Sequence, residues 1–184
     1  GDTRFHIPFI AWYQVMNASL ALTTMEVLKD RIPVTMEQLQ AGIANTRWQG
    51  RMETILPGVI VDGAHNEDGV RRFVETAERF QKEYPLTLLF SAVNDKDYQD
   101  MIHTICSRIK FRKVVTTEVG GYREVPSAEL AEIFCKEGCK DVGNSDNIEE
   151  AFHMAHEAKG EDGMLFCVGS LYLVGEIKTL LLKK

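Results

Sequence analysis

The sequence has no long apolar run, few cysteines and no excess of positive charge. A membrane-spanning helix needs about 18–20 consecutive apolar residues, and no such run occurs among the 184 residues. The formal net charge of -6 argues against a nucleic-acid partner, because phosphate binding requires clustered lysine and arginine. Four cysteines are too few for a secreted disulfide scaffold. We therefore expect a cytoplasmic protein that binds neither nucleic acid nor membrane.

A phosphate-binding loop is also missing. The pattern G-x-x-x-x-G-K-[ST], whose backbone N–H groups cradle nucleotide phosphates, occurs nowhere in the sequence. The segment NDKD at residues 94–97 does not replace it, since the guanine-reading motif has lysine directly after asparagine. A nucleotide could therefore bind here only through another arrangement.

The cysteines and histidines leave a metal site as a minor alternative. Cys135 and Cys139 are four residues apart on an expected helix, and His153 and His156 are three apart on another, so each pair could reach one ion. Structural zinc sites usually have tighter paired spacings. We therefore interpret the two cysteines as buried small hydrophobic residues and the two histidines as surface residues, and predict no metal site.

What the sequence does contain is an alternation of apolar strands and amphipathic helices. Apolar spacing predicts helices over residues 13–30 and about 36–45, the second with Thr35 as N-cap and Gln38 completing a capping box. Further strands are expected near residues 52–54, 59–61, 86–93, 113–119, 142 and 164–170, and further helices at 66–83, 97–109, 127–136, 147–158 and the end of the chain. Strands that are apolar on both faces and separated by helices predict an α/β fold. Its doubly wound, mostly parallel sheet has helices on both faces and follows a short helical segment.

The segment VIVDGAHNEDG at residues 59–69 holds the densest group of polar side chains after a strand. Asp62, His65 and Asn66 follow an apolar strand and precede a helix, at the edge where doubly wound sheets bind ligands. Backbone N–H groups at the helix start could hold a ribose, a phosphate or a carboxylate. An alternative is that Asn66 only caps the helix and the other two side chains only complete the turn.

Several motifs, in order, resemble the folylpolyglutamate synthase and dihydrofolate synthase family of the Mur ligase superfamily. They are WQGRME at 48–53, VDGAHNEDG at 61–69 and GSLYLVGEIK at 169–178, with NDKD between them and Gln14 and Asn17-Ala18 upstream. The last motif favours folate ligases over peptidoglycan ligases. Three residues depart from the family pattern: Ala11 and Tyr13 replace its Gly and His, and Glu67 replaces its Pro.

The resemblance implies a division of the chain and an activity. Residues 1–46 would be the incomplete helical tail of a central ATPase domain, and residues 47–184 a carboxy-terminal glutamate-ligase domain. The activity would be ATP-dependent ligation of L-glutamate to folate through an acyl phosphate. The family's phosphate loop and Mg²⁺ ligands lie in an amino-terminal ATPase part, which would be this chain's partner. We therefore expect negligible activity from the chain alone, and exposed apolar helix faces in its first 46 residues.

Residue by residue, the resemblance implies three contacts to ATP. Asn17 matches an asparagine that contacts the base. Arg51 matches a catalytic arginine that reaches the phosphates, for which its forked donors and permanent charge are suited. Asp62 matches an aspartate that contacts the ribose hydroxyls.

Three further residues would serve glutamate. His65 matches a catalytic histidine near the glutamate and the transferring phosphate, and Ser170 and Tyr172 match the motif that lines the glutamate pocket. Lys96 is a weaker candidate, because an exposed lysine is common. For Ser170 the alternative is an N-cap of the last helix, and for Tyr172 a core aromatic ring with a tethered hydroxyl.

Other functions remain open from the residues alone. A peptidoglycan-precursor ligase would have the same fold and ATP chemistry with another acceptor. A non-catalytic module would bind a nucleotide or an amino acid without chemistry, and a purely structural domain would bind neither.

Overall fold

The protein folds as two compact units. The computed structural model describes residues 3–94, 97–121 and 124–182. Contacts divide the chain into Gly1–Gln49 and Gly50–Lys184, a boundary slightly later than the predicted one after residue 46. That the first unit is part of an ATPase domain stays a prediction. No helix within the described ranges is both long and apolar enough to cross a membrane.

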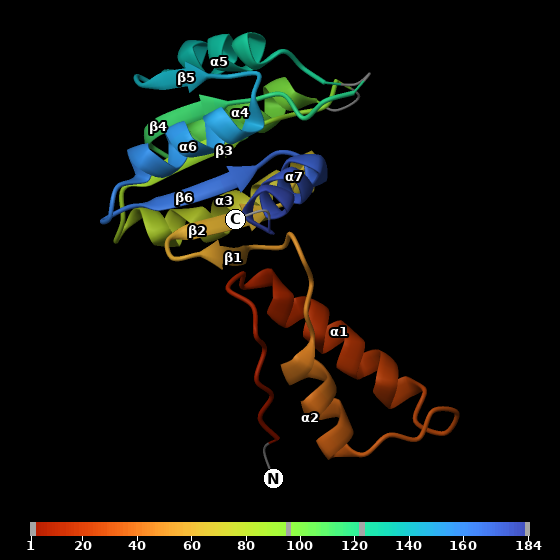
Figure 1. Ribbon diagram of the computed structural model, residues 1–184. Helices are drawn as coiled ribbons and strands as arrows, with labels where there is room; N and C mark the ends of the chain where they lie inside the picture. Colours follow the sequence, from red (N-terminus) through yellow and green to blue (C-terminus); the bar gives the residue numbers. More distant parts are fainter. Residues whose placement is uncertain (1–2, 95–96, 122–123, 183–184) are drawn as a thin grey trace. The chain divides into compact units, whose positions relative to one another are not determined.

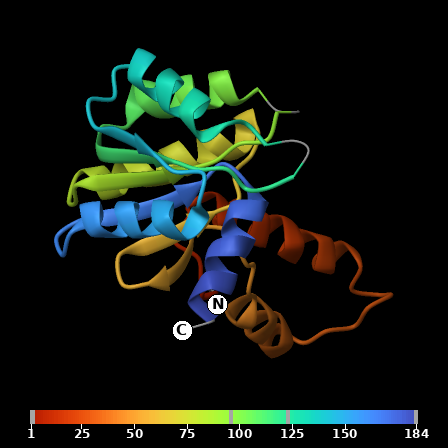
Figure 2. The ribbon, with the colours of Figure 1, turned by 45° about the horizontal axis from the view of Figure 1, so that its top comes forward.

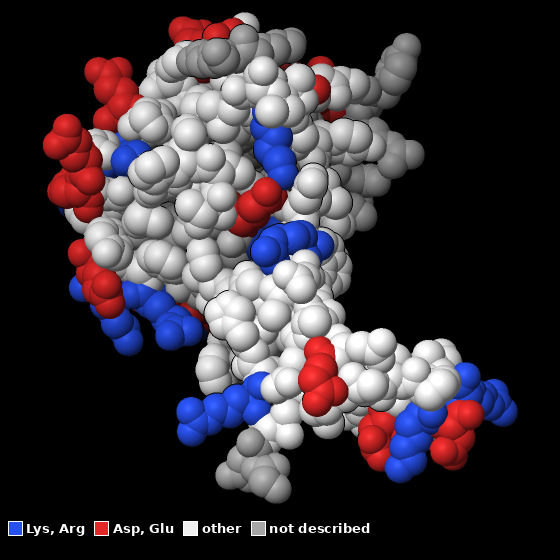
Figure 3. Space-filling model, turned by 60° about the horizontal axis from the view of Figure 1, so that its bottom comes forward, with Lys and Arg blue, Asp and Glu red and all other residues white. Residues whose placement is uncertain are grey.

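The first unit consists of two helices, α1 (Tyr13–Val27) and α2 (Met36–Asn45). The predicted capping box of α2 is confirmed, because the Thr35 hydroxyl accepts from the Gln38 backbone N–H and the Gln38 side-chain oxygen accepts from the Thr35 backbone N–H. Residues 5–25 contain no charged side chain. Figure 3 shows this unit with charge gathered at the turn that follows α1 and large uncharged areas elsewhere.

Large apolar side chains of α1 and its flanks face solvent. Trp12, Met16 and Leu20 are 70%, 69% and 69% exposed. A surface of this kind marks an interaction site when its members are contiguous.

The second unit is built on a six-stranded sheet in the order β1-β2-β6-β3-β4-β5. Its strands are β1 (Glu53–Leu56), β2 (Val59–Asp62), β3 (Leu86–Phe90), β4 (Phe111–Thr116), β5 (Val142–Asn144) and β6 (Met164–Val168). Strand β1 pairs antiparallel with β2 through a turn that contains Gly58, which has a φ of +70°. All other neighbours pair in parallel. The predicted doubly wound, mostly parallel sheet is therefore confirmed.

Helices cover both faces of this sheet, as Figures 1 and 2 show. Their bounds are α3 (Glu67–Gln81), α4 (Tyr98–Arg108), α5 (Ser127–Lys136), α6 (Ile148–Lys159) and α7 (Leu171–Leu182). Helices α3, α4 and α5 lie on one face and α6 and α7 on the other. After β5 the chain crosses to the other face of the sheet, where it forms α6, and then returns to the middle of the sheet as β6. This is the topology of a doubly wound sheet.

Alternate residues of the inner strands build two separate apolar layers, because successive side chains point to opposite faces. Toward α6 and α7, buried strand residues pack with helix residues such as Phe152, Leu173 and Ile177. Toward α3 and α5, Phe166 meets Phe73 edge-on at a centroid distance of 5.5 Å, and Phe90 meets Phe134 at 5.3 Å. Both layers bury their aromatic and aliphatic side chains almost completely.

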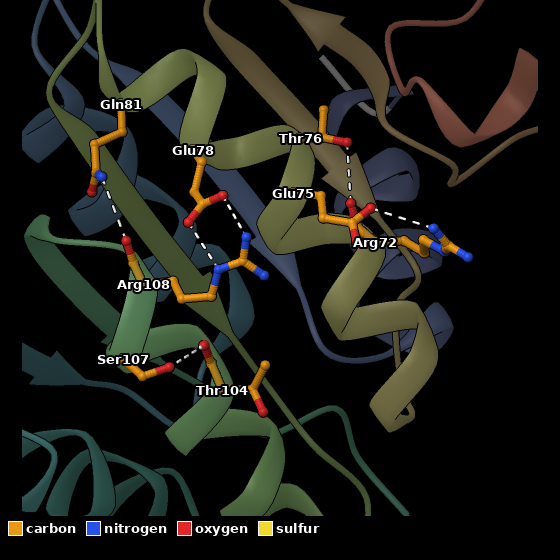
Figure 4. Close-up of polar contacts among 8 residues, drawn as sticks. All are labelled: Arg72, Glu75, Thr76, Glu78, Gln81, Thr104, Ser107 and Arg108. Atoms are coloured by element: carbon orange, nitrogen blue, oxygen red, sulfur yellow. Dashed lines mark hydrogen bonds and ion pairs between the residues drawn. The ribbon is translucent and has the colours of Figure 1, made fainter.

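Polar contacts join α3 to the end of α4 (Figure 4). The guanidinium of Arg108 donates to both carboxylate oxygens of Glu78, at 2.8 and 2.6 Å. Gln81 donates to the Arg108 carbonyl and accepts from the Lys110 backbone. A bidentate pair fixes orientation even where its exposure limits its net energy, so the carboxyl end of α4 is held in place.

Gly169, after β6, lies closer to β3 than any other residue type could. A Cβ atom added there would be 2.0 Å from the Ser91 carbonyl oxygen, and the φ of Gly169 is +111°. Both facts exclude a side chain at this position.

We therefore predict that Gly169→Ala lowers the free energy of unfolding by more than about 2 kcal/mol, through backbone strain and a steric clash. Urea denaturation of the chain would measure this change. Gly175→Ala is the matched control, since nothing lies within 4 Å of a Cβ atom at Gly175. In the middle of α7 it should raise stability by up to about 1 kcal/mol. Equal stability of the two variants would contradict the role given to Gly169.

Candidate functional site

Four predicted site residues of the second unit lie at or just after the carboxyl ends of neighbouring strands, whereas Arg51 precedes β1. Asp62 of β2 is level with Val168 of β6, which is level with Phe90 of β3. The loops that carry His65, Ser170 and Tyr172 leave the sheet from this edge. It is the edge at which open α/β sheets bind ligands.

Three sequence motifs meet there. The Gly63 backbone N–H donates to the Gly50 carbonyl at 2.7 Å. A Cβ atom on Gly63 would lie 2.2 Å from the Leu171 side chain, so Leu171 packs directly on the glycine. One packed cluster is therefore formed by three segments that are far apart in sequence: the GRM segment (residues 50–52), the DGAHN loop (residues 62–66) and the start of α7.

The carboxylate of Asp62 ties two of these segments together. One oxygen accepts from the Met52 backbone N–H at 2.9 Å and the other from the Ala64 backbone N–H at 2.8 Å. Asp62 is 2% exposed. Met52 has a φ of +46°, the one positive value among the described non-glycine residues, and such a strained conformation persists only where the surroundings impose it.

Burial raises the pKa of Asp62 to about 6. Its two backbone hydrogen bonds act in the opposite direction, as do the charges of Arg51 and of protonated His65. Arg51 is thus close enough to Asp62 to affect its ionisation. A guanidinium and a carboxylate, which are the predicted ATP contacts, share this part of the edge.

His65 is half-buried and oriented by the turn. Its Nδ1 lies 2.7 Å from the Gly63 carbonyl oxygen. A carbonyl oxygen can only accept, so Nδ1 carries the proton and Nε2 of the neutral ring is the acceptor. Asn66 caps α3 by accepting from the Gly69 backbone N–H at 2.8 Å. The capping alternative is therefore confirmed for Asn66.

Ser170 and Tyr172 occupy the start of α7. Ser170 is 2% exposed, and its hydroxyl oxygen accepts from the Tyr172 backbone N–H at 3.1 Å. Ser170 therefore does cap the helix, and its own O–H can still donate. Tyr172 is 70% exposed, so its interpretation as a core aromatic residue is wrong.

An anchor that the sequence did not indicate holds the Arg51 loop. Glu53 accepts from the Gly50 backbone N–H at 2.7 Å and from Lys178 of α7 at 2.8 and 3.0 Å. Both residues belong to recognised motifs, WQGRME and GSLYLVGEIK, but their pairing spans 125 positions. Only the folded chain reveals it.

The other candidates lie elsewhere. Asn17 is on α1 in the first unit, where its amide donates to the Gln14 side chain at 2.8 Å. Lys96 falls outside the described residues. The residues that are described contain no cluster of three or more His, Cys, Asp or Glu side chains that could hold a metal ion.

Comparison with known proteins connects this geometry to a family. A family model described as "Mur ligase, glutamate ligase domain" matches residues 50–171. A dihydrofolate synthase/folylpolyglutamate synthase of Bacillus subtilis is 30% identical over 177 residues, which cover 92% of this chain and 39% of that protein. A probable bifunctional folylpolyglutamate synthase/dihydropteroate synthase of Haloferax volcanii is 28% identical over 94% of this chain and 20% of its own length.

A solved structure agrees with these relatives. The Mycobacterium tuberculosis folylpolyglutamate synthase, solved in complex with ADP and AMPPCP, superposes with a TM-score of 0.81. It is 26% identical, over 96% of this chain and 41% of its own. The chain thus spans about two fifths of the Bacillus relative and of this structure.

The burial of Asp62 predicts an unusual titration. Its carboxyl carbon, observed by NMR, should titrate with a midpoint at about pH 6, against an ordinary value of 3.8. Because the folded state holds the proton more tightly, this group's stabilising contribution is fully present below pH 3.8 and lost as the pH rises to about 6. Over this pH range the free energy of unfolding falls by about 3 kcal/mol because of this group. An Asp62 midpoint near 4 would contradict the prediction.

Proposed function

This chain belongs to the Mur ligase glutamate ligase domain family, and we propose that it is the carboxy-terminal part of a folylpolyglutamate synthase. The reaction would be ATP-dependent amide ligation of L-glutamate to folate, with the folate carboxylate activated as an acyl phosphate. One observation carries the proposal: the GRM segment, the DGAHN loop and the start of α7 pack into one cluster at the edge of the sheet where such folds bind ligands.

The chain covers only part of its relatives' length, so activity is proposed for a longer protein. Its phosphate loop and magnesium ligands would lie in an amino-terminal ATPase part, where bound Mg²⁺ offsets phosphate charge. The exposed apolar surface of α1, with Trp12, Met16 and Leu20, would pack against that part. Because all four cysteines are free, we also propose a cytoplasmic location.

The chemistry of the donor set fits a nucleotide at Asp62 and Arg51. Each carboxylate oxygen of Asp62 accepts one backbone hydrogen bond and keeps a lone pair for a ribose hydroxyl. Glu67 and Asp68 already occupy the first turn of α3, so their charge disfavours a phosphate at that helix start. The phosphates would instead be contacted by Arg51, and the base by Asn17 of the first unit.

His65 and Ser170 are proposed to serve glutamate. Glutamate must lose an ammonium proton before its nitrogen attacks the acyl phosphate, and Nε2 of His65 can accept that proton. The hydroxyl of Ser170, at the start of α7, can donate to a glutamate carboxylate, which the helix dipole also favours. The exposed Tyr172 would line the same pocket.

We predict that this chain, mixed with the separately produced amino-terminal part of the Bacillus subtilis relative, incorporates labelled glutamate in an ATP- and folate-dependent manner. His65→Ala should lower the rate about 100-fold through loss of the base, and Asp62→Ala should weaken ATP binding. Asp68→Ala and the exposed His153→Ala are matched controls that should retain the rate. Each component alone should be inactive.

The alternatives give different outcomes in the same assay. Halves that associate during gel filtration but transfer no glutamate to folate would sink the folate assignment. Transfer to a peptidoglycan precursor would then support the other branch of the superfamily. Binding of AMPPNP without transfer to either acceptor would support a non-catalytic module.

Ser170 gives a second prediction, on specificity. In the reconstituted enzyme, Ser170→Ala should raise the KM for glutamate about 10-fold or more, by removing one hydrogen bond to a charged group, and leave the KM for ATP nearly unchanged. The substitution also removes a helix cap. Asn147→Ala is therefore the control, because it removes the hydrogen bond from the Glu150 N–H that caps α6 at a similar stability cost. A rise in the KM for ATP as large as that for glutamate would contradict the assignment.

A further inference from the structure

Two thiols lie against each other on the α4–α5 side of the sheet. The Sγ atoms of Cys106, in α4, and Cys139, just after α5, are 3.6 Å apart. Both side chains are half-buried. A disulfide requires an S–S distance of about 2.05 Å, so the sulfurs need to approach by about 1.5 Å.

The end of α5 fixes the position of Cys139. The Cys139 backbone N–H donates to the Phe134 carbonyl and the Gly138 N–H to the Cys135 carbonyl, both at 3.0 Å. With Gly138 at a φ of +91°, this is a Schellman motif, the tight ending of a helix in a left-handed residue. Cys139 is therefore held in place by backbone hydrogen bonds rather than carried on a loose loop.

Cys106 is fixed as firmly. One turn earlier on the same face of α4, His103 lies 2.9 Å from Glu137 of the α5 ending. At the end of α4, Arg108 is paired with Glu78 (Figure 4). The two thiols thus face each other between two anchored segments.

We propose that Cys106 and Cys139 form a reversible disulfide that crosslinks α4 to the end of α5, with a low-molecular-weight disulfide such as oxidised glutathione as the oxidant. One protein thiolate attacks a sulfur of the glutathione disulfide, forms a mixed disulfide and releases one glutathione. The second protein thiolate attacks the protein sulfur of that mixed disulfide and releases the other glutathione. Two protein thiols are oxidised and one glutathione disulfide is reduced to two thiols.

The two thiols share a hydrogen bond in which either sulfur can be the donor. The geometry therefore leaves both cysteines able to act as the first nucleophile, with the other as the resolving thiol. Of the remaining cysteines, Cys135 is exposed, whereas Cys167 is fully buried in β6, where burial raises its pKa.

The crosslink lies away from the candidate ligand edge. A crossover helix runs back along its sheet, so the carboxyl ends of α4 and α5 lie toward the amino ends of the parallel strands. Oxidation is thus expected to stabilise the fold without altering the site. The closed loop joins residues 33 positions apart, and closing it restricts the unfolded chain.

The test is to incubate the whole chain with oxidised glutathione. The free-thiol count should fall from four by two, and mass spectrometry of a digest should find Cys106 linked to Cys139. The melting temperature should rise by about 5 °C or more and return on treatment with dithiothreitol. The Asp62 titration midpoint should stay the same.

Single variants decide the assignment. Cys106→Ser and Cys139→Ser should each abolish the melting shift, and Cys135→Ser should retain it. A crosslink through Cys135, stable glutathione adducts on single cysteines or an unchanged thiol count would each overturn the proposal. Should a serine variant fail to fold, the linked peptide of the wild-type chain still gives the answer.

Discussion

A buried carboxylate, Asp62, determines the arrangement of the candidate site. Its two oxygens hold the backbone of Met52 on one side and of Ala64 on the other, so the GRM segment and the DGAHN loop cannot move independently. The strained φ of Met52 is retained because its N–H is bound to this carboxylate. In turn, the fixed loop orients His65 through the Gly63 carbonyl. Removing the carboxylate would release both segments together.

Close backbone packing complements this electrostatic link. Glycine at position 63 admits the Leu171 side chain, and glycine at position 169 lets the end of β6 approach the Ser91 carbonyl. The Glu53–Lys178 pair adds a third connection between the Arg51 loop and α7. Polar side chains from three sequence regions are thereby supported by a rigid frame, as a site for positioning reactants requires.

The fold could be predicted from the sequence because its elements are locally encoded. The apolar strands, amphipathic helices and capping residues such as Thr35 and Asn66 each carry their own signal. Local signals were wrong where tertiary contacts compete for a side chain. A serine at the start of a predicted helix would ordinarily be its N-cap, but Ser127 is the first residue of α5, and its hydroxyl donates to Asp146 of the β5–α6 connection.

The positions of the candidate site residues could be predicted only in part. Asp62, His65 and Ser170 stand next to strand ends, which the topology of a doubly wound sheet brings to one edge. The Glu53–Lys178 and Cys106–Cys139 pairings join residues far apart in the chain, and no spacing rule indicates them. The exposure of Tyr172 was also hidden, because an aromatic residue at a helix start fits a core position equally well.

The two ends of the sheet have a consequence for how the chain can associate with other polypeptides. The outermost strands are β1, with four residues and a register irregularity, and β5, with three residues. Edges this short or irregular are poor templates for another strand, because they offer few consecutive backbone donors and acceptors. Association is therefore left to side-chain surfaces such as that of α1, where specificity depends on the shape and polarity of the partner rather than on backbone pairing.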